Sequence, residues 1–256
     1  MTDPRVDPVA ARFGAVAADY DRGRPSYPAA VLDRLAAVAG LGPGTQVLDL
    51  AAGTGKLTRQ LVDAGASVVA VEPSAGMRER LEMSVPGARA LDGTGEAIPL
   101  PDGAVDLVTV AQAFHWFRTA EALDEIRRVL RPGGWLALTW NEAPTTAWAR
   151  ELWDLRHRLT GYTGAYPGDG WDAVVDADPR FGPRTITVVD VEIAVTIEEL
   201  TSDSASRSYV IALDPAVRAE VLDAVAALLA DHPDVADRPE LTYERPCSLH
   251  LCQRLG

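Results

Sequence analysis

A short apolar run that ends in closely spaced glycines is the segment of this sequence best suited to holding a ligand. Residues 47–55 read VLDLAAGTG, with a carboxylate at Asp49 and glycines at Gly53 and Gly55. Only a turn made of small residues lets a ligand lie directly against the backbone. In an open α/β sheet such a turn stands at the carboxyl end of a strand, where ligands bind. We therefore expect a binding site at this turn.

A phosphate-binding loop is the first interpretation of the turn, because Gly55 is followed by Lys56. That motif requires a glycine five residues before the Gly-Lys pair and a serine or threonine after it. Leu50 and Leu57 occupy those two positions. The sequence therefore excludes a nucleoside triphosphate site of this type.

A dinucleotide-binding turn is the second interpretation. Gly53 and Gly55 supply the first two glycines of a G-x-G-x-x-G pattern, but Thr58 stands where the third is expected. Glu72 follows at the distance from the turn at which an acidic residue binds the ribose hydroxyls of a dinucleotide. Other nucleoside cofactors use an acid in the same way, so Glu72 alone does not discriminate.

S-adenosylmethionine (SAM) is the third interpretation, and Asp49 favours it. A carboxylate would repel a bound pyrophosphate, whereas it attracts the ammonium and sulfonium groups of SAM. Glu72 can accept hydrogen bonds from both ribose hydroxyls of SAM. The acidic residues around the turn therefore suit a cationic cofactor.

Alternating strands and helices are expected to position these residues. Apolar runs bounded by turn residues predict strands, and apolar residues at helical spacing predict helices. The predicted strands span residues 46–51, 67–71, 88–91, 105–110, 135–140, 185–195 and 248–255. The predicted helices span residues 28–39, 57–64, 75–83, 119–130, 147–159, 197–210 and 214–230. The alternation over residues 45–140 indicates βαβ units and a parallel sheet.

Composition and charge set further expectations. The chain has 256 residues, a formal net charge of −13 and an ordinary globular composition, with 47% apolar and 24% charged residues. Such an acidic chain, without a cluster of basic residues, repels nucleic acid. No apolar run approaches the length of a membrane span, and residues 1–7 are too polar for a secretory signal. We expect a cytoplasmic protein, a monomer or homodimer, that binds neither nucleic acid nor membrane.

The cysteines and histidines predict neither disulfides nor a metal site. At their spacing, Cys247 and Cys252 point to opposite faces of a strand, so we expect them to be reduced core residues. None of the histidines pairs with a carboxylate at the spacing of metal ligands. The four histidines are His115, His157, His232 and His250.

Four motifs together resemble those of a known family. They read AADYDRGRPSYP, VLDLAAGTGKLT, VVAVEPS and GTGEAIPLPDGAVDLVTVAQAFHWF, and they lie within residues 13–141. This series is similar to that of class I SAM-dependent methyltransferases, above all the type-11 small-molecule group, which includes trans-aconitate and ubiquinone/menaquinone-biosynthesis methyltransferases. The resemblance implies a Rossmann-like, doubly wound, seven-stranded, mostly parallel sheet with helices on both faces and an antiparallel last strand.

The resemblance also implies how the chain is divided. Residues 1–256 would form a single methyltransferase domain. Residues 1–44 would be a leader with lid helices, residues 45–141 the SAM-binding half, and residues 142–256 the substrate-side insertions and the completion of the sheet.

Residues of the first two strands and the turn are assigned by the resemblance to the methionine and ribose parts of SAM. Asp49, Ala51, Gly53 and Gly55 would lie against the methionine part. Glu72 would bind the ribose.

The resemblance places the adenine between two further segments. Met77 would cover the ring, and Thr94, Gly95 and Glu96 would touch its rim. Thr94 stands where the family often has aspartate, which removes one acceptor for the adenine amino group.

The end of the fourth strand and the leader would complete the cofactor site. By the resemblance, Ala111 and Gln112 would line the methionine end. Tyr20 and Arg24 would close over the site, with Arg24 pairing with the carboxylate of SAM.

His115 and Trp116 would face the methyl acceptor, because they directly follow the fourth strand. The pKa of histidine suits a general base that deprotonates a hydroxyl near neutral pH, so His115 is the catalytic candidate. A carboxylate acceptor needs no base, since methyl transfer to it relies on positioning. Trp116 would form a wall of the cofactor and substrate pocket.

We expect a methyltransferase that passes the methyl group of SAM to a small-molecule acceptor, preferably an oxygen of a carboxylate or hydroxyl, and releases S-adenosylhomocysteine (SAH). Two alternatives stay open: an NAD-dependent oxidoreductase of Rossmann type, which Asp49 and the missing third glycine disfavour, and a non-catalytic SAM-binding scaffold protein.

Overall fold

A seven-stranded sheet forms the centre of the computed structural model, which describes residues 14, 16–162 and 170–256. The strands are β1 (Gln46–Leu50), β2 (Ser67–Val71), β3 (Arg89–Leu91), β4 (Val105–Ala111), β5 (Leu130–Asn141), β6 (Thr185–Val195) and β7 (Leu241–Gln253). Their order across the sheet is β3-β2-β1-β4-β5-β7-β6. Strands β1 to β5 pair in parallel, whereas β7 is antiparallel to both β5 and β6. The predicted fold class, a Rossmann-like mostly parallel sheet with an antiparallel last strand, is confirmed.

The central strand β1 shows why this part of the sequence is almost continuously apolar. It pairs with β2 on one side and β4 on the other, and four of its five residues are buried. A parallel strand covered on both faces needs apolar side chains in both directions. The polar exception is Asp49, which lies opposite Thr109 of β4.

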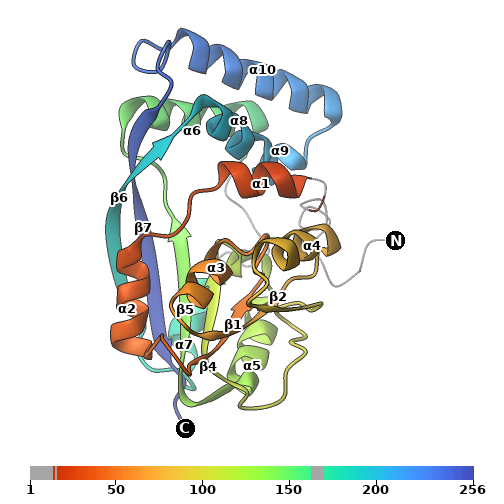
Figure 1. Ribbon diagram of the computed structural model, residues 1–256, viewed down its shortest axis with the longest axis vertical. Helices are drawn as coiled ribbons and strands as arrows, with labels where there is room; N and C mark the ends of the chain where they lie inside the picture. Colours follow the sequence, from red (N-terminus) through yellow and green to blue (C-terminus); the bar gives the residue numbers. More distant parts are fainter. Residues whose placement is uncertain (1–13, 15, 163–169) are drawn as a thin grey trace.

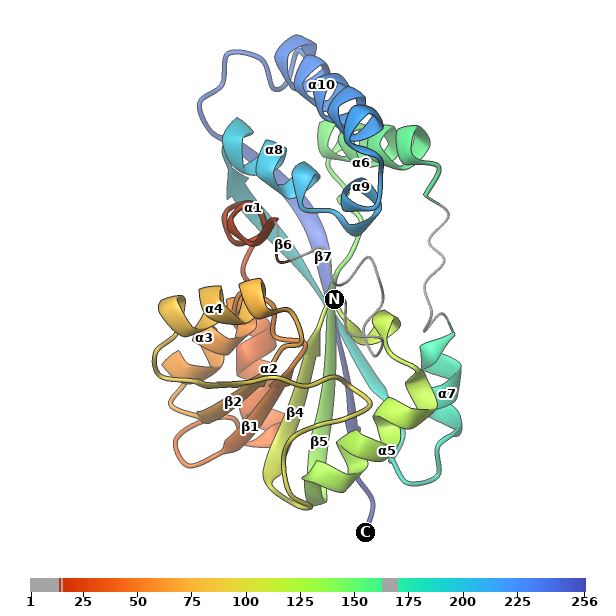
Figure 2. The ribbon, with the colours of Figure 1, turned by 90° about the vertical axis from the view of Figure 1, so that its right-hand side faces the viewer.

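Helices cover both faces of the sheet (Figure 2). On one side lie α2 (Ala29–Ala39), α3 (Lys56–Asp63) and α4 (Ala75–Ser84), and on the other lie α5 (Thr119–Val129) and α7 (Trp171–Ala177). Each side has its own apolar core. The helices on the two faces of the sheet do not cover the carboxyl ends of the parallel strands, which lie together at one edge (Figure 2).

The two cysteines of β7 belong to the two different cores. Cys247 packs in the core under α2 and α3, and Cys252 in the core under α5. Both are buried and free. The prediction of reduced core cysteines on opposite faces is confirmed.

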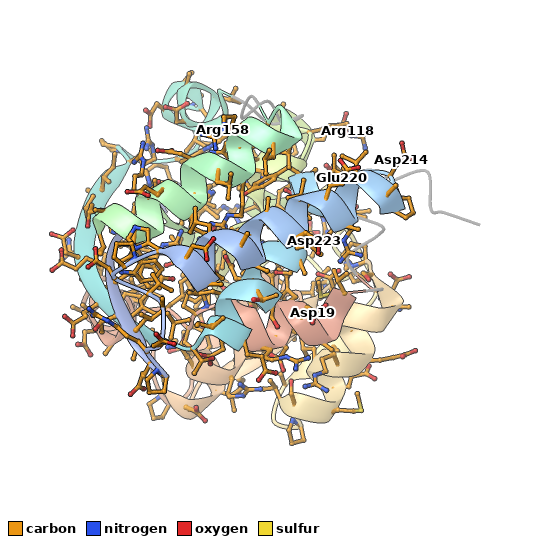
Figure 3. All side chains as sticks on the ribbon, turned by 90° about the horizontal axis from the view of Figure 1, so that it is seen from above. Asp19, Arg118, Arg158, Asp214, Glu220 and Asp223 are labelled. Atoms are coloured by element: carbon orange, nitrogen blue, oxygen red, sulfur yellow. The ribbon has the colours of Figure 1, made fainter. Side chains whose placement is uncertain are left out.

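A layer of helices stands above the carboxyl edge of the sheet, over the far ends of β6 and β7 (Figure 1). It consists of α6 (Ala147–Thr160), α8 (Ile197–Ala205), α9 (Ser208–Ile211) and α10 (Pro215–Asp231). Seen from above, α10 and α6 cross the layer beside each other, with acidic side chains of α10 such as Glu220 on the outer surface (Figure 3). A third apolar core joins this layer to the two long strands; it includes Trp148, Leu152, Val195, Leu200, Val225, Leu229 and Leu241.

A short helix, α1 (Ala17–Gly23), lies between this layer and α4 and packs on α8 (Figure 1). The crossing is close: a Cβ atom on Gly23 would lie 2.1 Å from the backbone nitrogen of Asp203. Only glycine permits such an approach of two backbones. The predicted helices do not include α1, because its sequence AADYDRG has no apolar periodicity.

Several boundaries differ from the predictions. The helix predicted over 197–210 is two helices, α8 and α9, with Ser206 and Arg207 between them. Strand β7 begins at Leu241, whereas the predicted strand begins at residue 248. The first half was not predicted, because Arg245 lies among its buried residues and breaks the apolar alternation. Helix α7 was not predicted either. Strand β5 also begins at Leu130 and not at residue 135, whereas the other differences lie outside the central βαβ units.

Within the described residues, no helix has the length and apolar character needed to cross a membrane. The same residues contain no group of three or more His, Cys, Asp or Glu side chains able to hold a metal ion.

Candidate functional site

Backbone strain gathers at the edge where the sequence predicts the ligand. Ala51, Gly53 and Gly55 in the turn after β1 have φ angles of 55°, 59° and 86°, and Gln112 after β4 has 59°. The left-handed region costs a residue other than glycine roughly 1–2 kcal/mol. Such strain is retained mainly where the surrounding structure needs it, often at functional sites. The strands β1 and β4 are neighbours, so Ala51 and Gln112 mark one site.

Asp49 is buried in the sheet directly below the turn. Its carboxylate accepts hydrogen bonds from the hydroxyls of Thr58 (2.6 Å) and Thr109 (2.9 Å). Burial raises its pKa to about 6, and the two hydroxyls oppose that shift. Asp49 thus connects β1 with β4 and α3. Its carboxylate lies buried beneath the turn.

Glu72 follows β2 and reaches across to the turn. One carboxylate oxygen accepts the N–H of Gly53 at 2.9 Å, and the other accepts the N–H of Ser74 at 2.8 Å. Burial raises the pKa of Glu72 to about 7, against the opposing effect of these two bonds. The structure therefore brings Glu72 and the glycine turn into contact, as a shared site requires.

Two side chains face the turn from other elements. A Cβ atom on Gly53 would meet Cε1 of Tyr20 at 3.7 Å and the sulfur of Met77 at 4.0 Å. Tyr20 comes from α1 and Met77 from α4. The two side chains thus flank the turn, as expected of groups that close over a cofactor.

Gly55 is explained by packing against α4. A Cβ atom there would lie 3.0 Å from side-chain carbons of both Leu81 and Val85. The neighbouring Lys56 amine lies 3.8 Å from Asp21 of α1, so it joins α3 to α1. Gly55 therefore allows the turn to pack closely against the side chains of Leu81 and Val85.

The segment predicted to touch the adenine rim contains an unpaired hydroxyl. Thr94 is buried, and its hydroxyl has no hydrogen-bond partner among the described residues. Gly95 lies against the ring of Phe117, which a Cβ atom would approach to 2.9 Å. Glu96 accepts the N–H of Arg118 at 2.8 Å and so ties this loop to the start of α5.

The residues predicted to line the site after β4 fall into two groups: one lies beside β5, and the other forms a short helix. Ala111 ends the strand, and the backbone N–H of Gln112 donates to the carbonyl of Thr139 in β5. His115 and Trp116 form the short 3-10 helix η2 (Phe114–Trp116), with ring centroids 5.4 Å apart. Both are half-buried.

Arg24 lies at the end of α1 with its guanidinium directed away from the turn. The Nε atom is 3.5 Å from a carboxylate oxygen of Asp203, and the guanidinium also donates to Ser206. It lies 5.0 Å from the centroid of the Tyr20 ring. Arg24 thus connects the cofactor side of α1 with α8.

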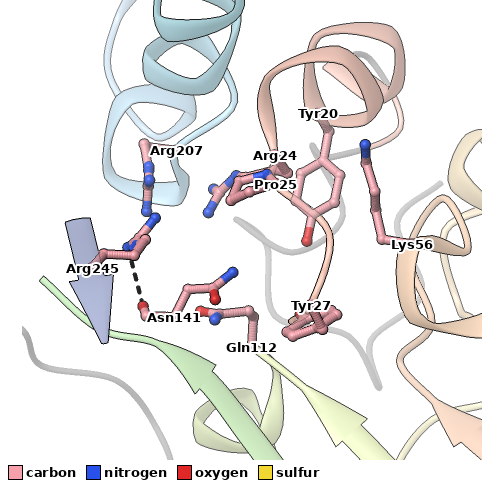
Figure 4. A pocket seen from close by; sticks show the side chains of 9 residues that line it. All are labelled: Tyr20, Arg24, Pro25, Tyr27, Lys56, Gln112, Asn141, Arg207 and Arg245. Atoms are coloured by element: carbon pink, nitrogen blue, oxygen red, sulfur yellow. Dashed lines mark hydrogen bonds between the residues drawn. The ribbon is translucent and has the colours of Figure 1, made fainter. Parts of the chain in front are cut away.

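A pocket opens between α1, the carboxyl ends of β4 and β5, and the helical layer (Figure 4). Tyr20, Arg24 and Gln112 line it, as the sequence predicts for the site. Its other polar lining residues were not predicted as site residues; they are Tyr27, Lys56, Asn141, Arg207 and Arg245. The only signal was the pair Asp203 and Arg207, four residues apart in a run of purely polar and small residues.

These features fit SAM. Two buried carboxylates, Asp49 and Glu72, stand next to the turn, and no ion pair to either is present in the described ranges. The side chain of Thr94 carries a buried hydroxyl without a partner among the described residues, which a nucleoside can satisfy. A cationic cofactor with ribose and adenine supplies both the missing charge and the missing hydrogen bonds.

Comparison with known sequences agrees with the geometry. Residues 48–138 match the family model described as "Methyltransferase domain". Over 241 residues the chain is 43% identical to an uncharacterized methyltransferase of Mycobacterium tuberculosis, with 93% of each chain covered. It is 38% identical over 162 residues to a malonyl-[acyl-carrier protein] O-methyltransferase of Methylococcus capsulatus, covering 60% of this chain and 58% of the relative.

Solved structures share the fold. A candidate type II methyltransferase from Anaeromyxobacter dehalogenans superposes with a TM-score of 0.67 at 22% identity, covering 91% of this chain and 97% of that one. Phosphoethanolamine N-methyltransferase 2 of Haemonchus contortus, in complex with SAM, gives a TM-score of 0.55 at 13% identity, covering 95% and 57%. With the near full-length relative, the confirmed fold and the motif series, the chain belongs to the class I SAM-dependent methyltransferase family.

Proposed function

We propose that this methyltransferase passes the methyl group of SAM to an oxygen of a small-molecule acceptor, either a carboxylate or a hydroxyl, and releases SAH. The observation that carries the cofactor part is Glu72, a buried carboxylate without an ion-pair partner in the described residues, in contact with the turn at Gly53. The O-methyltransferase among the relatives supports oxygen as the acceptor atom.

SAM supplies a methyl group that its sulfonium already activates for displacement. In the proposal, Glu72 accepts the ribose hydroxyls, and the Thr94 hydroxyl and Met77 contact the adenine. Asp49 adds negative charge below the methionine part. Tyr20 covers the turn and excludes water from it.

The acceptor is proposed to enter between α1, the helical layer and the segment after β4. A carboxylate acceptor needs only orientation at the reactive distance. For a hydroxyl acceptor, His115 is the proposed general base, because it lies in η2, the first element after the carboxyl end of β4. Under this proposal, residues 1–256 form one domain, in which residues 1–44 cover the site, 45–141 bind SAM and 142–256 shape the acceptor side.

Calorimetric titration of Glu72→Gln tests the cofactor assignment. At pH 8 the wild-type protein should bind SAH, and the variant should bind it at least about tenfold more weakly, because two charge-assisted hydrogen bonds are lost. The matched control is Glu79→Gln, an exposed glutamate on α4, which should leave the affinity unchanged.

NAD, titrated in parallel, should give no heat. An unchanged SAH affinity in Glu72→Gln would overturn the ribose assignment. Binding of SAH without methyl transfer to any carboxylic acid, phenol or quinone in a radiolabelled screen would favour the non-catalytic scaffold.

A further inference from the structure

The pocket of Figure 4 has an unusual charge for so acidic a protein. Four of the described side chains that line it are cations, and none is an acid. Arg24 and Lys56 stand on the side of the glycine turn, whereas Arg207 and Arg245 stand on the opposite wall, formed by the helical layer and β7.

Next to this wall, one carboxylate interacts with several guanidiniums. Asp203 accepts hydrogen bonds from Arg156 at 2.9 Å and from Arg207 at 2.8 Å, and it is 3.5 Å from Arg24. Arg245 donates to backbone carbonyls, among them that of Glu142 at 2.9 Å, and makes no ion pair within the described residues. Among the described residues, four guanidiniums therefore face a single negative charge.

These charges are taken out of water. Arg156, Arg207, Arg245 and Asp203 are each at most 8% exposed. A buried charge without a counter-charge is strongly unfavourable, so a cluster with excess positive charge is expected to bind an anion.

The guanidiniums are also held in place. The ring of Trp153 lies 5.9 Å from the guanidinium of Arg156, 5.4 Å from that of Arg207 and 6.0 Å from that of Arg245. The buried Nε2 atom of Gln112, which lacks a partner in the described residues, adds a hydrogen-bond donor at the same pocket. Planar guanidiniums beside an amide donor match the geometry of a carboxylate.

Two carboxylates are available in the reaction that we propose: that of the methionine part of SAM, and one on the acceptor. Lys56 directly follows the glycine turn, so the cofactor carboxylate is assigned to the side of Lys56. The four guanidiniums exceed the charge of Asp203 by three, so the single carboxylate of SAM leaves excess positive charge beside Arg207 and Arg245.

We propose that Arg207 and Arg245 bind a carboxylate of the methyl acceptor, so that the substrate class is small organic acids. This inference rests on the proposed function. The bound carboxylate orients the acceptor, and a different oxygen is methylated. That oxygen forms the new C–O bond, and the S–CH3 bond breaks with its electron pair left on sulfur. A hydroxyl acceptor also passes its proton to His115, the proposed base.

The first test uses matched pairs of small acids and their primary amides, such as succinate with succinamide and 4-hydroxybenzoate with 4-hydroxybenzamide. Wild-type protein saturated with SAH is titrated with each compound at constant ionic strength, and methyl transfer from labelled SAM is followed in parallel. Acids should bind at least about tenfold more tightly than amides. Equal affinity of acids and amides across the panel would overturn the inference.

The second test is Arg245→Met, with the exposed Arg34→Met as a control of equal charge change. For the best acid of the panel, KM should rise at least about tenfold in Arg245→Met, while the SAH affinity stays within about twofold and Arg34→Met behaves as wild type. Arg245→Lys keeps the charge and should recover part of the loss; it also serves if the methionine variant fails to fold.

The outcomes separate the two proposals. An unchanged KM in Arg245→Met overturns the inference alone. If Arg245→Met instead weakens SAH binding tenfold, or if acids compete with SAH, the cluster binds the cofactor carboxylate and the inference is again overturned. Absence of SAH binding in the wild type would refute the proposed function itself.

Discussion

Buried charges gather in two regions on either side of α1, and the two regions are unbalanced in opposite directions. Below the glycine turn, Asp49 and Glu72 have no ion-pair partner within the described residues. In the helical layer, Asp203 has three guanidinium partners and Arg245 has no carboxylate in the described ranges. The region below the turn has excess negative charge and the helical layer has excess positive charge, but no ion pair between the two regions is present among the described residues.

The pKa values express the same contrast. Burial raises the pKa of Asp49 to about 6 and that of Glu72 to about 7. Burial acts in the same direction on Asp203, but the charges of Arg207, Arg24 and Arg156 outweigh it and hold its pKa well below the ordinary value. Burial and then the nearby Arg207 lower the pKa of Arg245. A protein can thus hold opposite charge deficits for two ligands, which in our proposals are a cationic cofactor and an anionic acceptor.

Removing Asp203 should have the largest effect on stability. Asp203→Asn leaves buried guanidiniums without a counter-charge, so the free energy of unfolding should fall by about 3–5 kcal/mol. Urea denaturation measures the change. The control Asp19→Asn breaks a solvent-exposed pair with Arg22 and should cost at most about 1 kcal/mol.

A loss below about 1 kcal/mol in Asp203→Asn would mean that the guanidiniums reach water, and the contrast between the regions would then be wrong. Asp203→Glu keeps the charge and should lose less than the asparagine variant.

A pH series should reveal the opposite behaviour of the cofactor region. The pKa of Glu72 is raised from 4.5 to about 7 in the folded protein, so folding favours its protonated form. Its contribution to stability is fully present below the unfolded pKa and is lost as the pH rises to about 7, a change of about 3 kcal/mol.

The measurement compares ligand-free wild-type protein with Glu72→Gln at pH 4.5 and pH 8 by urea denaturation. The glutamine variant lacks this contribution, so its stability relative to wild type should increase with pH. An equal change in the free energy of unfolding of the two proteins between pH 4.5 and pH 8 would show that the pKa of Glu72 is not raised by folding. Glu79→Gln should remain parallel to wild type.

The smallest effect is expected at Thr94, and its sign is informative. Thr94→Val removes a buried hydroxyl without a partner in the described residues, so the protein should become about 1 kcal/mol more stable. SAH affinity should fall several-fold, because the proposed hydrogen bond from Thr94 to the adenine is lost. Thr58→Val, which removes a hydroxyl bonded to Asp49 at 2.6 Å, should instead destabilise. A loss of stability in Thr94→Val would show that its hydroxyl is already satisfied.

The sequence predicts the cofactor half of the molecule well, because local patterns determine it. Parallel strands buried on both faces give continuous apolar runs, and strand β2 has the predicted bounds. The glycine turn and Glu72 were predicted to share a site, and the structure brings them together. The spacing of a βαβ unit fixes that contact, so few residues suffice to predict it.

The buried ion pairs of the helical layer depend on contacts between distant segments and were not predicted. Asp203, Arg156 and Arg245 lie in three separate elements and meet only when the helical layer folds onto β7. In the sequence, the polar residues of α8 and the arginine of β7 are typical of exposed surface. Their burial follows from pairing across the fold, which no local pattern records.

One consequence follows from the position of α1 between the two regions. This helix places Tyr20 against the turn and, one helical turn later, Arg24 against Asp203, while Asp21 bonds to Arg80 and the Thr54 hydroxyl. The close crossing at Gly23 leaves no room between the backbones of α1 and α8, so neither helix can shift toward the other. The residues of α1 that face the glycine turn and those that face Asp203 are therefore fixed relative to each other by one short helix.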